Sequence, residues 1–147
     1  LLVLVFFGFI PVGGTYYVQA LTWTPDVTIA SFICGLLIDT LLVVNNYRDR
    51  EADARSGKRT VIVRFGEKFG RYFYLLLGIS ASLLCLYFLR EGHIYAALLP
   101  QLYLVPHVLT WRRMVKIHSG KKLNSILGET SRNMLFMGIL LAIGMIL

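Results

Sequence analysis

The sequence predicts an all-α protein, a polytopic bundle of transmembrane helices that forms a single domain. Three observations support this prediction. The composition is strongly apolar, since 56% of the 147 residues are hydrophobic and only 16% are charged, and the mean hydropathy is +0.66. The apolar residues are gathered in five long runs, and the basic residues are concentrated in two of the stretches between them. Such a composition is typical of membrane proteins and not of soluble domains.

Each apolar run is expected to form one membrane-spanning helix. In chain order the runs occupy residues 1–21, 27–44, 73–89, 95–111 and 134–147. A helix crosses about 30 Å of hydrocarbon with about 20 residues, so the first four runs are long enough or nearly so. The last run has 14 residues. It must therefore use part of the polar "LGETSRN" before it or continue past the end of the chain.

Three prolines, Pro11, Pro100 and Pro106, lie inside these runs. In a membrane helix, neighbouring helices can satisfy the backbone groups that a proline frees. The prolines are therefore compatible with the predicted spans.

The basic residues indicate how the spans are oriented. Eight Lys and Arg residues lie between positions 48 and 71 and six between 112 and 132, whereas the turns at 22–26 and 90–93 contain only Arg90. Five spans place the two basic stretches at one membrane face, which the positive-inside rule predicts to be cytoplasmic. Orientation and anionic headgroups thus account for the net charge of +7, so a lipid bilayer is the expected partner and nucleic acid is not.

A polar stripe follows the second apolar run. Asn45, Asp49 and Asp53 are spaced four residues apart, so on a continuing helix each lies about 40° around the axis from the one before. Asp39 and Asn46 are seven residues apart and lie within about 20° of each other. All five side chains therefore fit within an arc of roughly 120° at the basic end of this helix.

Carboxylates and amides without His or Cys are the ligands that a hard cation such as Mg²⁺ prefers. Mg²⁺ usually takes one or two protein carboxylates and completes its shell with water and phosphate oxygens. Lys58, Arg59 and Arg64 follow shortly after the stripe and can bind the remaining phosphate charge. The residues thus predict a site for a metal-bound diphosphate at a membrane surface.

A solvated helix end, with its Asp and Arg residues paired to one another, is the alternative interpretation of the stripe. Asp49 and Asp53 form a like-charged pair four residues apart, which is unfavourable without a cation. Asp39 lies several residues inside a span, where an ionisable side chain is expensive and usually functional. Both points favour the metal site, but a charged helix face, with Asp39 hydrogen-bonded to a neighbouring helix, remains open.

Four further polar residues lie in or beside the apolar runs. Glu129, Arg132 and Asn133 approach the basic end of the last span and could reach the mouth of the site, or Glu129 and Arg132 could form an ion pair three residues apart. His107 lies within a span and is expected to be a hydrogen-bonded histidine of the bundle interior, with a catalytic base as the alternative.

Three motifs resemble a known family: "NNYRDREADARSGKRT" at 45–60, "VGGTYYVQ" at 12–19 and "LGETSRNM" at 127–134. They are similar to those of the UbiA superfamily of intramembrane aromatic prenyltransferases, and most like the MenA branch, which uses 1,4-dihydroxy-2-naphthoate in menaquinone biosynthesis. The resemblance implies a nine-helix fold in which two Asp-rich motifs hold Mg²⁺ against a polyprenyl diphosphate. It assigns Asn45, Asp49 and Asp53 to the second motif, with Asp49 and Asp53 catalytic, and Lys58 and Arg64 to diphosphate binding.

The resemblance also implies which part of the fold this chain supplies. Residues 1–147 correspond to the fifth through ninth helices, a C-terminal part that lacks the first Asp-rich motif. We therefore expect the chain to be inactive alone and to need the missing N-terminal half of the same fold as a partner.

The implied reaction transfers a polyprenyl group from its diphosphate to 1,4-dihydroxy-2-naphthoate with loss of CO₂, at the cytoplasmic face of the bacterial inner membrane. Other prenyltransferases of this type, acting on 4-hydroxybenzoate or on a haem or chlorophyll precursor, share the Asp motif. The alternative outside the enzymes is a non-catalytic membrane fragment, and the absence of the first Asp-rich motif supports it.

Overall fold

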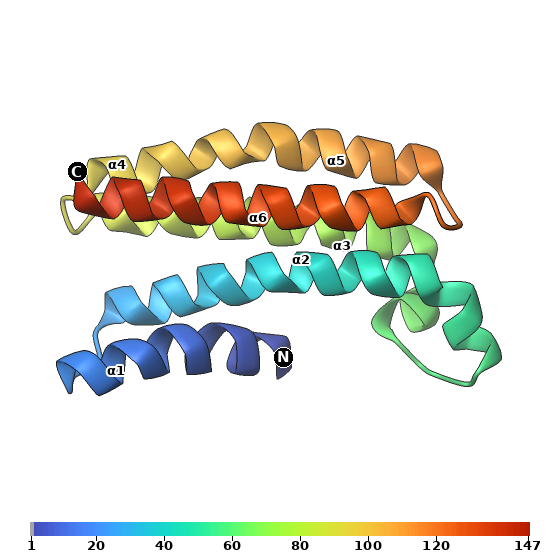
Figure 1. Cartoon of the computed structure of the whole chain (residues 1–147), viewed down its shortest axis with the longest axis horizontal. Helices are drawn as coiled ribbons and strands as arrows, with labels where there is room; N and C mark the ends of the chain where they lie inside the picture. Colours follow the sequence, from blue (N-terminus) through green and yellow to red (C-terminus); the bar gives the residue numbers. More distant parts are fainter. Residues whose placement is uncertain (1) are drawn as a thin grey trace.

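The computed structural model describes residues 2–147 as a bundle of five consecutive helical segments, without a strand in that part of the chain (Figure 1). The first segment joins η1 (Leu4–Gly14) to α1 (Thr15–Ala20), and the second is α2 (Pro25–Arg55). The third joins α3 (Val61–Leu84) to η2 (Cys85–Leu89). The fourth joins α4 (Ile94–Leu98), η3 (Leu99–Tyr103) and α5 (Leu104–Ile117), and the fifth is α6 (Leu123–Ile146).

These segments confirm the predicted helical membrane bundle. Within residues 2–147, three helices are able by length and composition to cross a membrane: Pro25–Arg55, Val61–Leu89 and Leu123–Ile146. The segment Leu4–Ala20 is apolar but shorter. The helix α6 includes the polar "LGETSRN" that precedes the short last run. This is one of the two ways in which the run was predicted to reach the length of a span.

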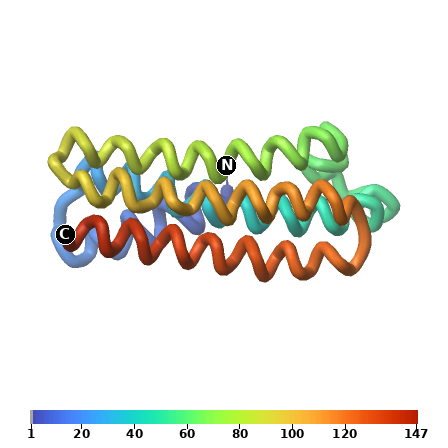
Figure 2. Tube along the Cα trace, turned by 90° about the horizontal axis from the view of Figure 1, so that it is seen from above, coloured from blue at the N-terminus to red at the C-terminus, as the bar shows by residue number. Residues whose placement is uncertain are grey.

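The segments run antiparallel, and the two basic loops lie at the same end of the bundle, on the right in Figure 1. Helix α2 is the central element and contacts η1, α3 and α6. Figure 1 shows η1 and α1 beside α2 on one side and α3, α5 and α6 on the other, and Figure 2 shows the same arrangement from above. The alternation of basic and non-basic loops predicted from the sequence is therefore confirmed.

Helix α2 begins at a conventional cap and continues well beyond its apolar part. The Oγ1 of Thr24 accepts a hydrogen bond from the Val27 backbone N–H at 3.4 Å, and Pro25 occupies the first helical position, where its lack of an N–H has no cost. The helix then runs without interruption to Arg55. The polar stripe is consequently helical, as was predicted from the four-residue spacing of its members.

Helix α3 starts twelve residues before the apolar run at 73–89 that predicted it. The run did not include this first part because charged residues interrupt it. Thr60 caps it by accepting a hydrogen bond from the Val63 N–H at 3.3 Å. Gly66 adopts φ 86° and ψ 172° inside the helix, a backbone conformation that glycine adopts readily and other residues avoid. The first turn of α3 is thereby set at an angle to the remainder.

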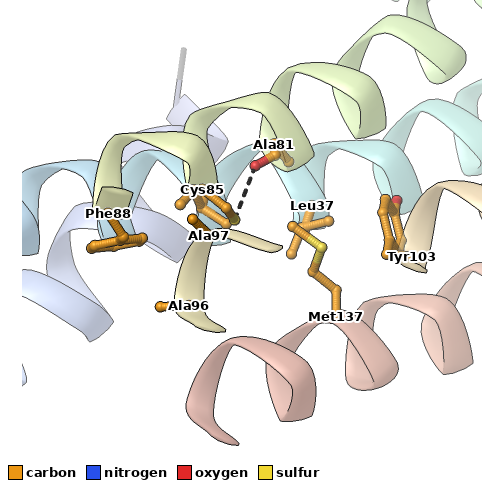
Figure 3. Close-up of a cluster of buried hydrophobic side chains, with 9 residues drawn as sticks. Leu37, Ala81, Cys85, Phe88, Ala96, Ala97, Tyr103 and Met137 are labelled. Atoms are coloured by element: carbon orange, nitrogen blue, oxygen red, sulfur yellow. Dashed lines mark hydrogen bonds between the residues drawn. The ribbon is translucent and has the colours of Figure 1, made fainter. Parts of the chain in front are cut away.

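Two buried clusters form the interior. Figure 3 shows the first, in which Leu37 of α2 and Met137 of α6 lie near one another and the Cys85 thiol donates to the Ala81 carbonyl at 3.4 Å. The second lies toward the basic end: Val43, Val44, Tyr47, Ile62, Tyr74, Leu77, Met114, Leu123 and Ile126. His107 is buried, with Nδ1 2.9 Å from the Tyr103 hydroxyl and Nε2 3.3 Å from the Leu75 carbonyl oxygen. The prediction of a hydrogen-bonded interior histidine is confirmed.

Two glycines allow η1 to approach α2 closely. A Cβ at Gly8 would collide with the Ser31 carbonyl oxygen, and a Cβ at Gly35 would lie 2.8 Å from Leu4 Cδ2 and 3.5 Å from Gly8 Cα. Small residues at such a crossing let membrane helices pack backbone to backbone. The pair therefore sets the position of the first helical segment.

We expect Gly35→Leu to separate η1 from α2, because the new side chain has no space at this crossing. The predicted loss of folding free energy is about 1–3 kcal/mol, read from SDS titration followed by far-UV circular dichroism. Gly138→Leu is the matched control, since a Cβ at Gly138 meets no atom within 4 Å. Equal unfolding midpoints for the two variants would contradict this assignment.

Candidate functional site

The predicted site residues lie where α2 leaves the apolar part of the bundle. Asn45, Asp49 and Asp53 occupy successive turns of the same helix, which ends at Arg55. The Asp49 side chain is 45% exposed and that of Asp53 only 12%. The two carboxylates thus share a helix face but differ in their surroundings.

Asp49 is held by the arginine beside it in the chain. The Nε of Arg48 donates to Asp49 Oδ1 at 2.7 Å, and Nη2 donates to Oδ2 at 2.6 Å. The same guanidinium donates through Nη1 to Asn124 Oδ1 on α6 at 3.0 Å. This two-pronged ion pair, a strong and directional interaction, connects the acidic turn of α2 to the start of α6.

Asp53 is buried and only half satisfied. Its Oδ1 lies 3.3 Å from Lys58 Nζ, whereas Oδ2 is buried and has no hydrogen-bond partner within residues 2–147. A buried carboxylate oxygen without a partner is unfavourable by about 1–3 kcal/mol or more. A cation bound to Oδ2 would remove this penalty, so the donor set fits the predicted Mg²⁺.

The predicted phosphate-binding residues lie on the loop and first turn that follow. Lys58 is brought next to Asp53, and its side chain is 63% exposed. Arg59 and Arg64 are exposed, and neither forms an ion pair with any acidic residue in the part of the chain that the structure describes. Lys58 is thus paired with Asp53, whereas Arg59 and Arg64 keep their charges without an acidic partner among the described residues.

Asp39 and Asn46 lie deeper on α2. They line a groove of about 330 Å³ together with Val61, Ile62 and Phe73. Asp49 and Asp53 lie about one and two turns beyond Asn46 on the same helix and do not line this groove. Asn46 therefore lies one turn from Asp49, whereas Asp39 lies about three turns before it, and both line a groove that the acidic pair does not line.

Within residues 2–147, no three His, Cys or acidic side chains come together as a complete metal site. Asp49 and Asp53, the predicted ligands at this end of α2, each have a basic partner. The described residues thus supply part of a ligand set.

A polar network centred on Glu67 was not found by sequence reasoning. Its Oε1 accepts from the Tyr47 hydroxyl at 2.8 Å, from Arg71 Nη2, and from His118 Nδ1 at 2.6 Å, while Arg50 Nη2 lies 3.6 Å from Oε2. These residues come from α2, α3 and the loop after α5. In the sequence, the only sign of this network was the spacing of Glu67 and Arg71, which are four residues apart, as in a helical ion pair.

The Glu67 network holds the turn of α2 that carries Asp49. Tyr47 and Arg50 flank this turn, and both bind Glu67. Arg50 Nη1 also donates to the Tyr47 carbonyl oxygen at 2.7 Å, and its guanidinium lies 4.6 Å from the Tyr47 ring centre, an arrangement that is attractive by cation–π interaction. The acidic turn is therefore clamped from the α3 side.

Glu129, Arg132 and Asn133 do not reach the acidic residues of α2. Glu129 instead bonds across to α5, accepting from Arg113 Nη1 at 2.9 Å and from the Thr110 hydroxyl at 3.2 Å. The alternative of a Glu129–Arg132 ion pair is wrong, because α5 offers Glu129 better-placed donors than its own helix does.

A long apolar groove of about 620 Å³ lies between η1, α2 and α6. Its walls include Val12 from η1, Ala30 and Ile38 from α2, and Met134 and Gly138 from α6. The groove is large and apolar enough for a hydrocarbon chain.

Comparison of the sequence with known proteins identifies a family. The model described as "UbiA prenyltransferase family" matches residues 1–140. The chain is 43% identical over 84 residues to the 1,4-dihydroxy-2-naphthoate octaprenyltransferase of Escherichia coli (strain K12), covering 57% of this chain and 27% of the relative. It is 40% identical over 84 residues to the Mycobacterium leprae (strain TN) protein of the same name, covering 56% of this chain and 28% of the relative.

The chain thus matches little more than a quarter of the length of these curated relatives. No solved structure matches it. Because the family model covers almost the whole sequence, from residue 1 to residue 140, the chain belongs to the UbiA prenyltransferase family.

Proposed function

We propose that this chain forms the C-terminal part of a membrane prenyltransferase of menaquinone biosynthesis. The reaction joins the prenyl group of a polyprenyl diphosphate to 1,4-dihydroxy-2-naphthoate and releases diphosphate and CO₂. The observation that carries the proposal is the unpartnered, buried Oδ2 of Asp53 beside Lys58, on the helix face that also carries Asp49. The family match and the printed names of the relatives support it.

Asn45, Asp49 and Asp53 would hold Mg²⁺, which when bound supplies positive charge to the diphosphate leaving group. Oδ2 of Asp53 is buried without a hydrogen-bond partner, whereas both oxygens of Asp49 are paired with Arg48. Asp49 would therefore have to give up part of this pairing to act as a ligand. The bond from Arg48 to Asn124 of α6 uses Nη1, which does not contact Asp49.

The basic residues would bind the diphosphate oxygens directly. Lys58 is held near Asp53, and Arg59 and Arg64 are exposed on the loop and first turn that follow, so all three can form charge-assisted hydrogen bonds to phosphate. As the allylic C–O bond breaks, its electron pair leaves with the diphosphate, and these donors stabilise the added charge. The ring carbon that bears the carboxylate then forms the new C–C bond and loses CO₂.

The orientation of the site follows from the loops. Both basic loops lie at the end of the bundle that carries Asp49 and Asp53, and positive loops favour the cytoplasmic side. We therefore propose that the site faces the cytoplasm of a bacterial cell, where soluble acceptors and Mg²⁺ have access to it.

The isoprenoid tail would occupy the apolar groove between α2 and α6. We expect Gly138→Leu to lower turnover of a long polyprenyl diphosphate by about tenfold, because it fills the groove, and to leave a ten-carbon donor almost unaffected. Gly128→Leu on the same helix lies outside the groove and has equally open space around its Cβ. Turnover of both donors by the two variants, measured side by side, checks this; equal losses on the long donor would contradict it.

The proposed activity is tested by Mg²⁺-dependent release of pyrophosphate and CO₂ in membranes supplied with a polyprenyl diphosphate and 1,4-dihydroxy-2-naphthoate. The chain alone is compared with the chain joined to the N-terminal half of the Escherichia coli relative. Activity of the joined form with this acceptor, and not with 4-hydroxybenzoate, is the expected result. A folded joined form that releases neither product contradicts the proposal.

A further inference from the structure

A small polar notch lies between α5 and α6, apart from the acidic end of α2. It has a volume of about 190 Å³, and its polar lining consists of Thr110, Arg113, Glu129, Arg132 and Asn133. Thr110 and Asn133 form a buried floor, in which Asn133 Nδ2 donates to the Thr110 hydroxyl at 2.9 Å. The floor is thus rigid and already hydrogen-bonded, and the arginines form the walls.

The notch carries a surplus of positive charge. Its one carboxylate, Glu129, is neutralised by the ion pair with Arg113 Nη1 and also accepts a hydrogen bond from the Thr110 hydroxyl. Within residues 2–147, Arg132 has neither an acidic partner nor a side-chain hydrogen bond. The guanidinium of Arg132 and the remaining N–H groups of Arg113 are therefore free to bind one anion, and planar guanidinium groups match phosphate oxygens well.

An apolar track leads away from the notch toward the middle of the bundle. Leu102 on η3 and Val105 on α5, with Phe136 and Ile143 on α6, lie on the notch side of their helices. All four side chains are exposed. An anion site at the basic end followed by exposed apolar side chains matches a molecule with an anionic head and hydrocarbon chains. Basic pockets between membrane helices bind anionic lipid headgroups.

The notch is separate from the apolar groove of the proposed reaction. On α6 the groove is lined by residues such as Ser131 and Met134, whereas the notch is lined by Glu129, Arg132 and Asn133. The two sets point in roughly opposite directions, about 175° apart around the helix axis. A ligand in the notch therefore lies on the opposite side of α6 from the groove.

We propose that the α5–α6 notch binds the phosphate of an anionic phospholipid headgroup, with the acyl chains along the exposed track of α5 and α6. The lipid would fasten α5 to α6 at the basic end and add to the Arg113–Glu129 bond between them. Phosphate is the shared chemistry of a lipid headgroup and of the free ion, and the experiment separates the two.

The test is a native mass-spectrometry titration of the purified 147-residue chain with phosphatidylglycerol, phosphatidylcholine and inorganic phosphate in separate arms. Phosphatidylglycerol is expected to bind most tightly, and Arg132→Ala to raise its apparent Kd about fivefold. Arg132→Lys should lose less, because it retains the charge. Lys121→Ala removes an equal charge from the adjoining loop, outside the notch, and should leave the Kd unchanged.

Each remaining outcome overturns the proposal. Equal affinity for the two lipids removes the headgroup preference, and an unchanged Kd in Arg132→Ala, or the same loss in Lys121→Ala, removes the notch as its location. Binding of inorganic phosphate as tight as that of the lipid makes this an ion site. Arg132 is exposed, so its variants should fold, and far-UV circular dichroism of each variant verifies that they do.

Discussion

Asp53→Asn is expected to lower Mg²⁺-dependent pyrophosphate release by roughly a hundredfold or more in the chain joined to a family N-terminal half. The amide keeps the shape of the side chain but removes the charge that a metal ligand needs. Because Oδ2 of Asp53 is buried without a partner, the same change should leave folding stability equal or slightly higher. Lys58 loses its partner at little cost, since its side chain is 63% exposed.

The measurement is an Mg²⁺ titration of pyrophosphate release, paired with SDS unfolding of the same variant. Glu51→Gln is the matched control: it is also an acid-to-amide change on α2, but Glu51 is exposed and should keep full activity. A stable Asp53→Asn protein with undiminished activity would remove the metal role of Asp53. Loss of activity together with loss of folding would show that Asp53 is a structural residue.

Glu67→Ala is expected to reduce the free energy of unfolding by about 1.5–3 kcal/mol. The substitution leaves the buried Tyr47 without its acceptor and deprives Arg71 and His118 of their shared carboxylate. Since these residues join α2, α3 and the loop after α5, the basic end of the bundle should loosen before the rest. Limited proteolysis should then cut first in the loop between α2 and α3.

SDS titration followed by far-UV circular dichroism measures the loss, and Glu67→Gln should lose less because its amide oxygen can still accept from Tyr47. Glu91→Ala is the control at the opposite end, where Glu91 is exposed and accepts only a 3.5 Å bond from Tyr87. An unfolding midpoint for Glu67→Ala equal to that of Glu91→Ala would mean that the network does not stabilise the fold.

The helical segments were predictable because hydropathy acts locally. Five apolar runs became five helical segments, and the uneven distribution of Lys and Arg correctly predicted two basic loops at one end. The start of the third segment was not predictable from hydropathy, since charged residues interrupt the apolar ones in the first part of α3, from Val61 to Arg71. Two of these charged residues, Glu67 and Arg71, are paired within the Glu67 network, and hydropathy does not detect such pairing.

The candidate site likewise has one part that was predictable from the sequence and one part that was not. The spacing of Asn45, Asp49 and Asp53 alone determined that they share one face of a helix, since helical periodicity is a local property. The burial of Asp53 Oδ2 without a partner was decided by tertiary structure, as was the bond from Arg48 to Asn124, 76 positions apart in sequence. The pairing of Glu129 with Arg113 on α5 was decided in the same way. Contacts between distant segments depend on how the helices pack against one another, and no pattern within a single helix contains that information.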